Sequence, residues 1–226
     1  GHLSLAKYLF ITNHADNPAL DIHDAEEFFI HMLERADFRR DLHFQTSVTI
    51  DTLDYTGHGL NQGSKLVLAA CGEKQRELPK NFGEDLALPA GFEKPKTAMK
   101  GVLVVEAPKH TAPRGEYDQS LIRFCDTYEP DHPINNFPLI VLVDDSSFAA
   151  ASISNFLWTT FTRSNPANDV YGIGAFTHVK HFGCTGSLVI DARVKAYHPE
   201  AMEMDEDIVR KVEKMAARGG PLSGLF

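Results

Sequence analysis

Short apolar runs alternate with amphipathic helical patterns along this 226-residue chain, and this alternation is what most constrains its fold. In the first half, "KYLFIT" has the pattern of a buried strand over residues 7–12. The segment "DAEEFFIHMLER", residues 24–35, places apolar residues at helical spacing, and Asp24 is the expected N-cap. Extended patterns follow at residues 42–50 and 66–71. Because strands that alternate with helices form sheets covered by helices, we expect an α/β fold with mixed or largely parallel sheets.

The second half repeats this order of elements, with strands expected at residues 138–143, 169–176 and 188–192 and a helix at residues 147–163. Arg35 and Asp41 of the first half are spaced like Arg163 and Asp169 of the second. We therefore predict two diverged copies of one αβ unit, although any alternating chain can imitate a repeat. For these pairs we favour a structural role over catalysis, because arginine suits a helix C-terminus and aspartate suits the turn beyond it.

The segment at residues 73–100 is rich in proline, glycine and charge, and we take it as the link between the two units. The predicted domains are residues 1–95, the first unit with its linker, and residues 96–226, the second unit with a terminal helix. The segment "DEDIVRKVEKMAARGG" predicts that helix. Its apolar stripe consists of Ile208, Val209, Val212 and Met215, and we expect the stripe to cover its own domain or a neighbouring subunit.

Composition excludes several classes of partner and location. The formal net charge of −9 disfavours nucleic acid and anionic membranes, since phosphate binding needs a positive surface. Three widely spaced cysteines suggest neither a disulfide framework nor a zinc site, and the apolar run at residues 137–143 is too short to span a bilayer. We expect a soluble cytoplasmic protein without an export signal. The chain opens without a methionine, which suggests either a scar of cloning or a piece cut from a longer protein.

The polar residues with chemical potential all have a structural interpretation as well. Asp144 and Asp145 follow an apolar strand, where open α/β sheets bind ligands, but we favour a role in capping the next helix. The loop at residues 57–65 could wrap a phosphate, yet it runs into a strand rather than a helix, so we expect a structural turn. His178 and His181 have no carboxylate nearby in sequence, and we predict no metal site. Spacing alone supports no active site.

Several segments nevertheless resemble the C-terminal domain of UbiD-type decarboxylases, the 3-octaprenyl-4-hydroxybenzoate carboxy-lyase family. These domains have an apolar strand ending in Val-x-Asp-Asp, a helix with Leu/Ile-Trp that closes with Arg-x-x-Pro-x-x-Asp, and a later Gly-Ser-Lys that leads to an Asp-Ala strand. The first half keeps part of the pattern through residues 35, 41, 50–57 and 63–70, but it lacks the Trp and the Asp-Ala. The residues that match in the second half are Asp144, Asp145, Leu157, Trp158, Arg163, Pro166, Asp169, Asp191 and Ala192.

The resemblance implies a carboxy-lyase that removes CO2 non-oxidatively from an aromatic or α,β-unsaturated carboxylic acid, such as polyprenyl-4-hydroxybenzoate in ubiquinone biosynthesis. Family enzymes form homo-oligomers and use prenylated FMN, an electron sink, with a divalent metal and potassium. Their catalytic Glu-Arg-Glu set lies in a split-barrel domain upstream, which no segment here matches.

The resemblance therefore implies a C-terminal fragment that serves subunit assembly and walls the substrate cleft. We expect no catalytic, cofactor-binding or metal residue in it, and no activity of the fragment alone. The alternative is a free-standing small-ligand-binding module, with its ligand at the strand ends near Asp144.

Overall fold

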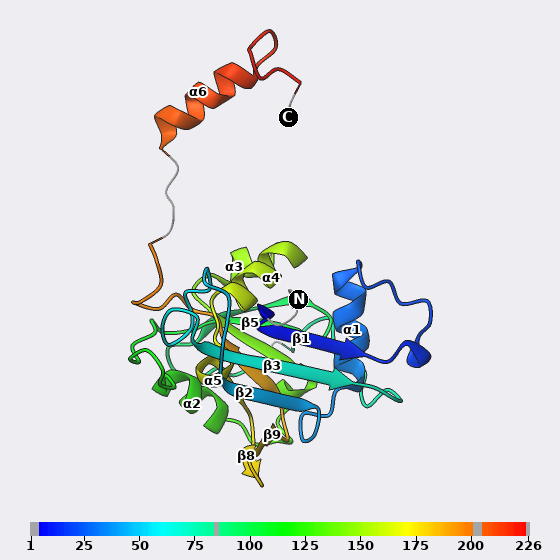
Figure 1. The fold of residues 1–226 in the computed structure, drawn as a ribbon. Coiled ribbons are helices and arrows are strands. Elements are labelled where there is room, and N and C mark those ends of the chain that lie inside the picture. Colours follow the sequence, from blue (N-terminus) through cyan, green and yellow to red (C-terminus); the bar gives the residue numbers. More distant parts are fainter. Residues whose placement is uncertain (1–4, 84–85, 201–204, 225–226) are drawn as a thin grey trace.

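Two mixed β-sheets with helices packed beside them form the body of the chain (Figure 1). The structure is a computed structural model that describes residues 5–83, 86–200 and 205–224. Because each sheet contains both parallel and antiparallel neighbours, the predicted α/β fold with mixed sheets is confirmed.

The strands fall into a three-stranded sheet, a five-stranded sheet and a hairpin. The three-stranded sheet has the order β1 (Tyr8–Thr12), β3 (Gly63–Ala70) and β2 (Leu42–Val48). The five-stranded sheet has the order β4 (Glu93–Met99), β5 (Val102–Glu106), β6 (Leu139–Val143), β10 (Leu188–Asp191) and β7 (Val170–Gly172). The hairpin consists of β8 (Ala175–His178) and β9 (His181–Cys184).

Most helices begin at a polar cap of the expected kind. Asp24 accepts a hydrogen bond from the backbone N–H of Glu27 (3.0 Å), and Asp145 accepts one from Phe148 (2.9 Å). Both contacts satisfy a donor that the first helical turn leaves free, so the predicted capping roles are confirmed. The helices are α1 (Ala25–Arg35), α2 (Gln119–Asp126), α3 (Ser146–Ala149), α4 (Ile153–Thr162), α5 (Pro166–Asp169) and α6 (Glu206–Ala216), with 3-10 turns at His14–Asp16 and Pro133–Asn136.

One apolar core joins the two halves of the chain. The Phe29 ring of α1 contacts the Phe156 and Phe161 rings of α4, at centroid distances of 6.1 and 6.0 Å. Phe29 also contacts Phe10 of β1 at 5.1 Å. Since α1 and β1 belong to the first half and α4 to the second, the halves fold around shared side chains.

The two sheets share a local arrangement. In each, a parallel pair is followed by an antiparallel edge strand: β1, β3 and β2 in one, and β6, β10 and β7 in the other. Asp41 accepts a hydrogen bond from the Asp37 backbone N–H (2.7 Å), and Asp169 accepts the same kind of bond from Asn165 (2.6 Å). This likeness agrees with a repeated unit, but a common origin of the two halves stays a prediction.

Two predicted elements differ in the structure. The helix expected over residues 147–163 is divided into α3 and α4, because Ser152 caps a new helix by accepting a hydrogen bond from Asn155 (3.1 Å). The link expected at residues 73–100 contains β4, an edge strand that pairs with β5. This strand crosses the predicted boundary between residues 95 and 96, and the division into two domains stays a prediction.

The terminal helix α6 has an apolar stripe that is largely exposed. Ile208, Val212 and Met215 are 57%, 43% and 42% exposed, and no residue of α6 is buried. Figure 1 shows α6 apart from both sheets. None of the helices within the described ranges has the length and apolar character needed to cross a membrane.

The shared core predicts that truncating two phenylalanines of neighbouring helices lowers the free energy of unfolding by very different amounts. Phe156→Ala, at a fully buried position, should lower the free energy of unfolding by about 3 kcal/mol or more, because it leaves a cavity between α1 and α4. Phe148→Ala, at a position that is 44% exposed, should lower it by less than about 1 kcal/mol. Urea unfolding measures both, and equal losses would contradict a core shared by the two halves.

Candidate functional site

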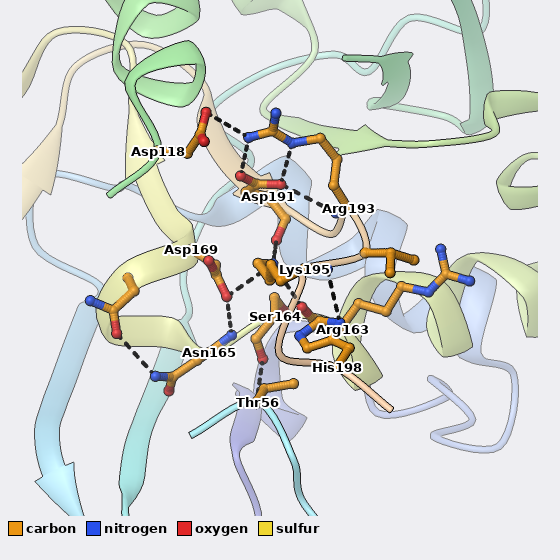
Figure 2. A network of polar contacts seen from close by, with 12 residues as sticks. Thr56, Asp118, Arg163, Ser164, Asn165, Asp169, Asp191, Arg193, Lys195 and His198 are labelled. Carbon is orange, nitrogen blue, oxygen red and sulfur yellow. Dashed lines mark hydrogen bonds and ion pairs between the residues drawn. The ribbon is translucent and has the colours of Figure 1, made fainter. Parts of the chain in front are cut away.

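Five charged side chains are buried together at the carboxyl end of β10. Asp191 ends the strand, and Arg193 and Lys195 follow it. Asp118 caps α2, and Asp169 ends α5. Each is at most 2% exposed, so each charge needs a partner within the protein. We call these five residues the ion cluster; Figure 2 shows them with their neighbours.

Arg193 binds two aspartates of the ion cluster. Its Nε lies 2.8 Å from Oδ1 of Asp191, and its Nη2 lies 2.5 Å from Oδ2, so the pair is bidentate. Nη2 also lies 3.1 Å from Oδ1 of Asp118. The remaining nitrogen, Nη1, donates to the Ser120 hydroxyl (2.8 Å) and to the Pro108 carbonyl. The guanidinium therefore ties α2 to the end of β10.

Lys195 ties the end of β10 to α4 and α5. Its Nζ donates to the backbone carbonyls of Arg163 (2.8 Å) and Asp191 (2.9 Å), and it lies 3.2 Å from Oδ2 of Asp169. Three partners match the three N–H groups of an ammonium. A lysine that uses all its protons in structural bonds leaves none for a ligand.

Burial and neighbouring charges act in opposite directions on the aspartates. Burial raises the pKa of Asp169 to about 6; the Lys195 charge opposes this effect, and the Asp191 charge reinforces it. Burial also acts to raise the pKa of Asp191, but the charges of Lys195 and Arg193 outweigh it and hold this pKa below its ordinary value. Burial acts on Asp118 in the same direction, but hydrogen bonds from Ser120 and Thr111 and the Arg193 charge hold its pKa well below the ordinary value.

One group in the described part of the chain has the spacing of a metal site. Single ligand atoms of His110, Asp169 and Asp191 lie within 4.8 Å of one another, and the His110 Nε2 is buried without a hydrogen-bond partner. Both carboxylates, however, already have a cation: Asp191 pairs with Arg193, and Asp169 pairs with Lys195. A divalent ion would have to displace these ion pairs, so the residues do not fit a metal.

Beside the ion cluster, uncharged side chains join the segment between α4 and α5 to the start of the three-stranded sheet. The Ser64 hydroxyl donates to Asn165, and it accepts a hydrogen bond from the Ala167 backbone N–H (2.8 Å). The Tyr8 hydroxyl lies 2.7 Å from the Ser164 hydroxyl. Since Ser64 is the second residue of β3 and is fully buried, the glycine-rich loop before the strand enters a packed junction and not a phosphate cradle.

Sequence analysis singled out Asp144, Arg163 and Trp158, and the structure brings them together near the surface. The Asp144 carboxylate accepts a hydrogen bond from the Val194 backbone N–H (2.7 Å) and lies 3.4 Å from Nη1 of Arg163. The Arg163 guanidinium stacks on the Trp158 ring at 4.9 Å, and Trp158 is 50% exposed. These contacts position the chain after β10.

The other sequence-derived candidates lie elsewhere. Arg35 is nearly buried and donates to the backbone carbonyls of His31 (2.9 Å) and Gly72 (3.0 Å), so it does not repeat the contacts of Arg163. His178 and His181 pair across the β8–β9 hairpin. Neither histidine joins the ion cluster.

Sequence reasoning did not single out Arg193, Lys195, His110 or His198. Burial lowers the pKa of His198 to about 3, helped by the charge of Lys195. The segment "DARVK" alternates polar and apolar residues like an exposed strand, and neither histidine belongs to a ligand motif. No local pattern marks these side chains as buried.

The fold and the ion cluster together define an α/β domain whose strand ends are fixed by internal ion pairs. A family model described as the 3-octaprenyl-4-hydroxybenzoate carboxy-lyase C-terminal domain matches residues 1–70. A Chlamydia pneumoniae protein, named as a subunit of 4-hydroxybenzoate decarboxylase, is 31% identical over 215 residues, which cover 95% of this chain and 34% of that protein. An uncharacterized protein of Chlamydia trachomatis serovar D is 34% identical over 207 residues, covering 91% and 33%.

The matched family model and the named relative support a UbiD-type C-terminal portion, as the motifs predicted. It spans about a third of the length of the curated relatives that it matches. The family model matches the first half, in which the sequence shows fewer motif residues, whereas the relatives align over nearly all of the chain.

Burial of Asp169 predicts a specific pH dependence of stability. A carboxyl whose folded pKa lies above its unfolded value of 3.8 stabilises the fold fully below that value, and this contribution is lost as the pH rises through about 6. Asp169→Asn removes the titration, so its unfolding free energy should fall less than that of the parent between pH 4 and pH 7. Chemical unfolding across this range, with Asp145→Asn as the control at an exposed cap, measures the difference. Parallel curves for Asp169→Asn and the parent would contradict the raised pKa.

Proposed function

We propose that this chain is the assembly part of a UbiD-like carboxy-lyase, and that catalysis takes place in another part of the full-length protein. The full-length enzyme would remove CO2 non-oxidatively from an aromatic or α,β-unsaturated carboxylic acid, of which polyprenyl-4-hydroxybenzoate in quinone biosynthesis is one example. Similarity to a protein named as part of a 4-hydroxybenzoate decarboxylase supports the reaction class. We place the enzyme in the cytoplasm as a homo-oligomer.

The observation that carries an assembly role is the exposed apolar stripe of α6. Ile208, Val212 and Met215 lie on one side of a helix whose other residues are mostly charged. An amphipathic helix with no buried residue gains stability when its apolar face is covered. We propose that a neighbouring subunit covers this face, because symmetric association buries the same face on both subunits.

The residues of this chain do not fit the flavin cofactor of the family. Prenylated FMN needs a phosphate site, but the glycine-rich loop leads into β3, and the Ser64 hydroxyl is already bonded to Asn165 and Ala167. The charges of the ion cluster are likewise paired. We therefore propose that prenylated FMN, the divalent metal and potassium bind outside this chain, which walls the substrate cleft.

The alternative is a small-ligand-binding module without catalysis. The position proposed from sequence, near Asp144, has its carboxylate engaged by Val194 and Arg163. One observation still favours this alternative: a cleft of about 450 Å³ lies between β2 and the β8–β9 hairpin.

The assembly role predicts that a change on the apolar stripe lowers the mass in solution. Val212→Glu places a charge on the stripe, whereas Arg210→Gln on the charged side changes the net charge by the same amount. We expect light scattering to give a lower mass for Val212→Glu and for deletion of residues 205–226, and an unchanged mass for Arg210→Gln. An unchanged mass of the deletion variant would contradict assembly through α6.

A second prediction concerns the chemistry. The purified chain should be colourless, should not bind prenylated FMN and should release no CO2 from hydroxybenzoate or cinnamate-like acids. Joining it to the upstream part of a full-length relative should restore flavin absorbance and turnover. Flavin absorbance or turnover by the isolated chain would show that the active site lies within these 226 residues.

A further inference from the structure

Three histidines lie close together where the β8–β9 hairpin contacts β2. His178 ends β8, His181 begins β9, and His43 is the second residue of β2. Figure 1 shows the hairpin next to β2. We call these three residues the histidine group. The sequence alone predicts no metal site at His178 and His181, and the structure adds a third imidazole from the other half of the chain.

Strand alternation places His43 and His181 on the same side of the contact between β2 and β9. Phe44 and Phe182 directly follow these histidines, and the two phenylalanine rings contact each other edge to face at 5.3 Å. Neighbouring residues of a strand point to opposite faces, so the histidines lie on the other side of this contact. Their imidazole rings are 6.1 Å apart there. The packed phenylalanines therefore fix the spacing of the two histidines.

The hairpin turn places His178 beside His181. These two residues are register partners in the antiparallel pair of β8 and β9. Side chains directly opposite each other share a face, with Cβ atoms about 4.5–5.5 Å apart. Only Val179 and Lys180 join the partners, and their φ angles are 48° and 65°. A two-residue turn with positive φ at both positions follows the twist of the strands, so it keeps the histidine pair in register.

The His181 ring has a nitrogen that is available to a ligand. Its Nε2 lies 3.0 Å from the Arg39 carbonyl oxygen, which can only accept a hydrogen bond. Nε2 therefore carries the proton, and Nδ1 of the neutral ring keeps its lone pair. Histidines that bind metals ordinarily donate the other ring N–H to a backbone carbonyl or carboxylate, which fixes the orientation of the ring. His181 already has this arrangement.

The other two rings are exposed and can turn toward His181. Within the described part of the chain, neither the His43 nor the His178 imidazole makes a hydrogen bond or an ion pair. Two imidazoles on one tetrahedral ion have ring centres roughly 5 Å apart, since each metal–nitrogen bond is about 2.0–2.1 Å long. Small rotations of the exposed side chains reach this spacing from 6.1 Å.

The charges around the histidine group also leave room for a cation. Unlike the buried triad of His110, this group contains no carboxylate whose ion pair a metal would have to break. The neighbouring Lys180 is exposed, so its long side chain can hold the ammonium in water and away from a bound ion.

We propose that the histidine group binds one divalent transition-metal ion of the zinc class. Neutral imidazole suits Zn²⁺, Cu²⁺ and Ni²⁺, whereas Mg²⁺ and Ca²⁺ prefer oxygen ligands. His43, His178 and His181 supply three nitrogens, and water takes the fourth position. The ion joins the hairpin to the edge strand β2, and so links the second half of the chain to the first. This inference does not depend on assembly through α6.

The test is a calorimetric titration of the 226-residue chain with ZnCl2 and, for comparison, MgCl2. We expect one Zn²⁺ per chain with a Kd on the order of 10 μM or below, and no binding of Mg²⁺. His43→Gln and His181→Gln should each weaken zinc binding by at least about tenfold. His23→Gln, at an exposed histidine before α1, should leave it unchanged. Absence of zinc binding, or parental affinity in both His43→Gln and His181→Gln, would overturn the proposal.

Thermal unfolding separates the loss of a ligand from a weakened fold. Saturating Zn²⁺ should raise the unfolding midpoint of the parent chain, because the ion binds only when β2 and the hairpin are folded together, and EDTA should reverse the rise. His43→Gln should keep the parental midpoint without zinc, since the position is exposed, and should lose the rise with zinc. An equal rise in His43→Gln and in the parent would contradict an ion that links β2 to the hairpin.

Discussion

The fold depends on burying two cations, Arg193 and Lys195, directly after the strand that ends in Asp191. Buried charges are tolerated only when partners replace the water that they lose. Arg193 obtains these partners from Asp191 and Asp118, and Lys195 obtains them from Asp169 and two backbone carbonyls. The chain after β10 must therefore lie against α2, the end of α4 and α5.

The need to pair every buried charge also means that the ion cluster serves the fold and not the binding of a ligand. Because the ion cluster is closed and internally paired, it has no free acid, base or metal ligand to offer a substrate. The features open to partners lie elsewhere: the apolar stripe of α6 and the cleft beside the β8–β9 hairpin. This division agrees with a chain that spans about a third of the length of the curated relatives that it matches.

Local chemistry made much of the fold predictable. Asp24 and Asp145 cap helices as expected, and the apolar runs at β1 and β6 form strands, because these features depend only on neighbouring residues. The edge strand β4 was missed because "EKPKTAM" is mostly polar and contains a proline, a composition that edge strands tolerate. The division of the predicted long helix depends on Ser152, whose capping role is not apparent within an apolar stretch.

The ion cluster was less predictable, because its members come from three separate segments. Asp169 and Asp191 were noted as motif residues, but Arg193 and Lys195 look like exposed surface charges in the sequence. Only the fold shows that Asp118 and Asp169 meet these cations. A double-mutant cycle on Lys195→Met and Asp169→Asn, measured by urea unfolding, tests this account most directly. Each single change should lower the unfolding free energy by about 3–5 kcal/mol, and the double variant should lose at least about 2 kcal/mol less than the two losses added together. Additive losses would contradict the claim that this pair holds the strand ends together.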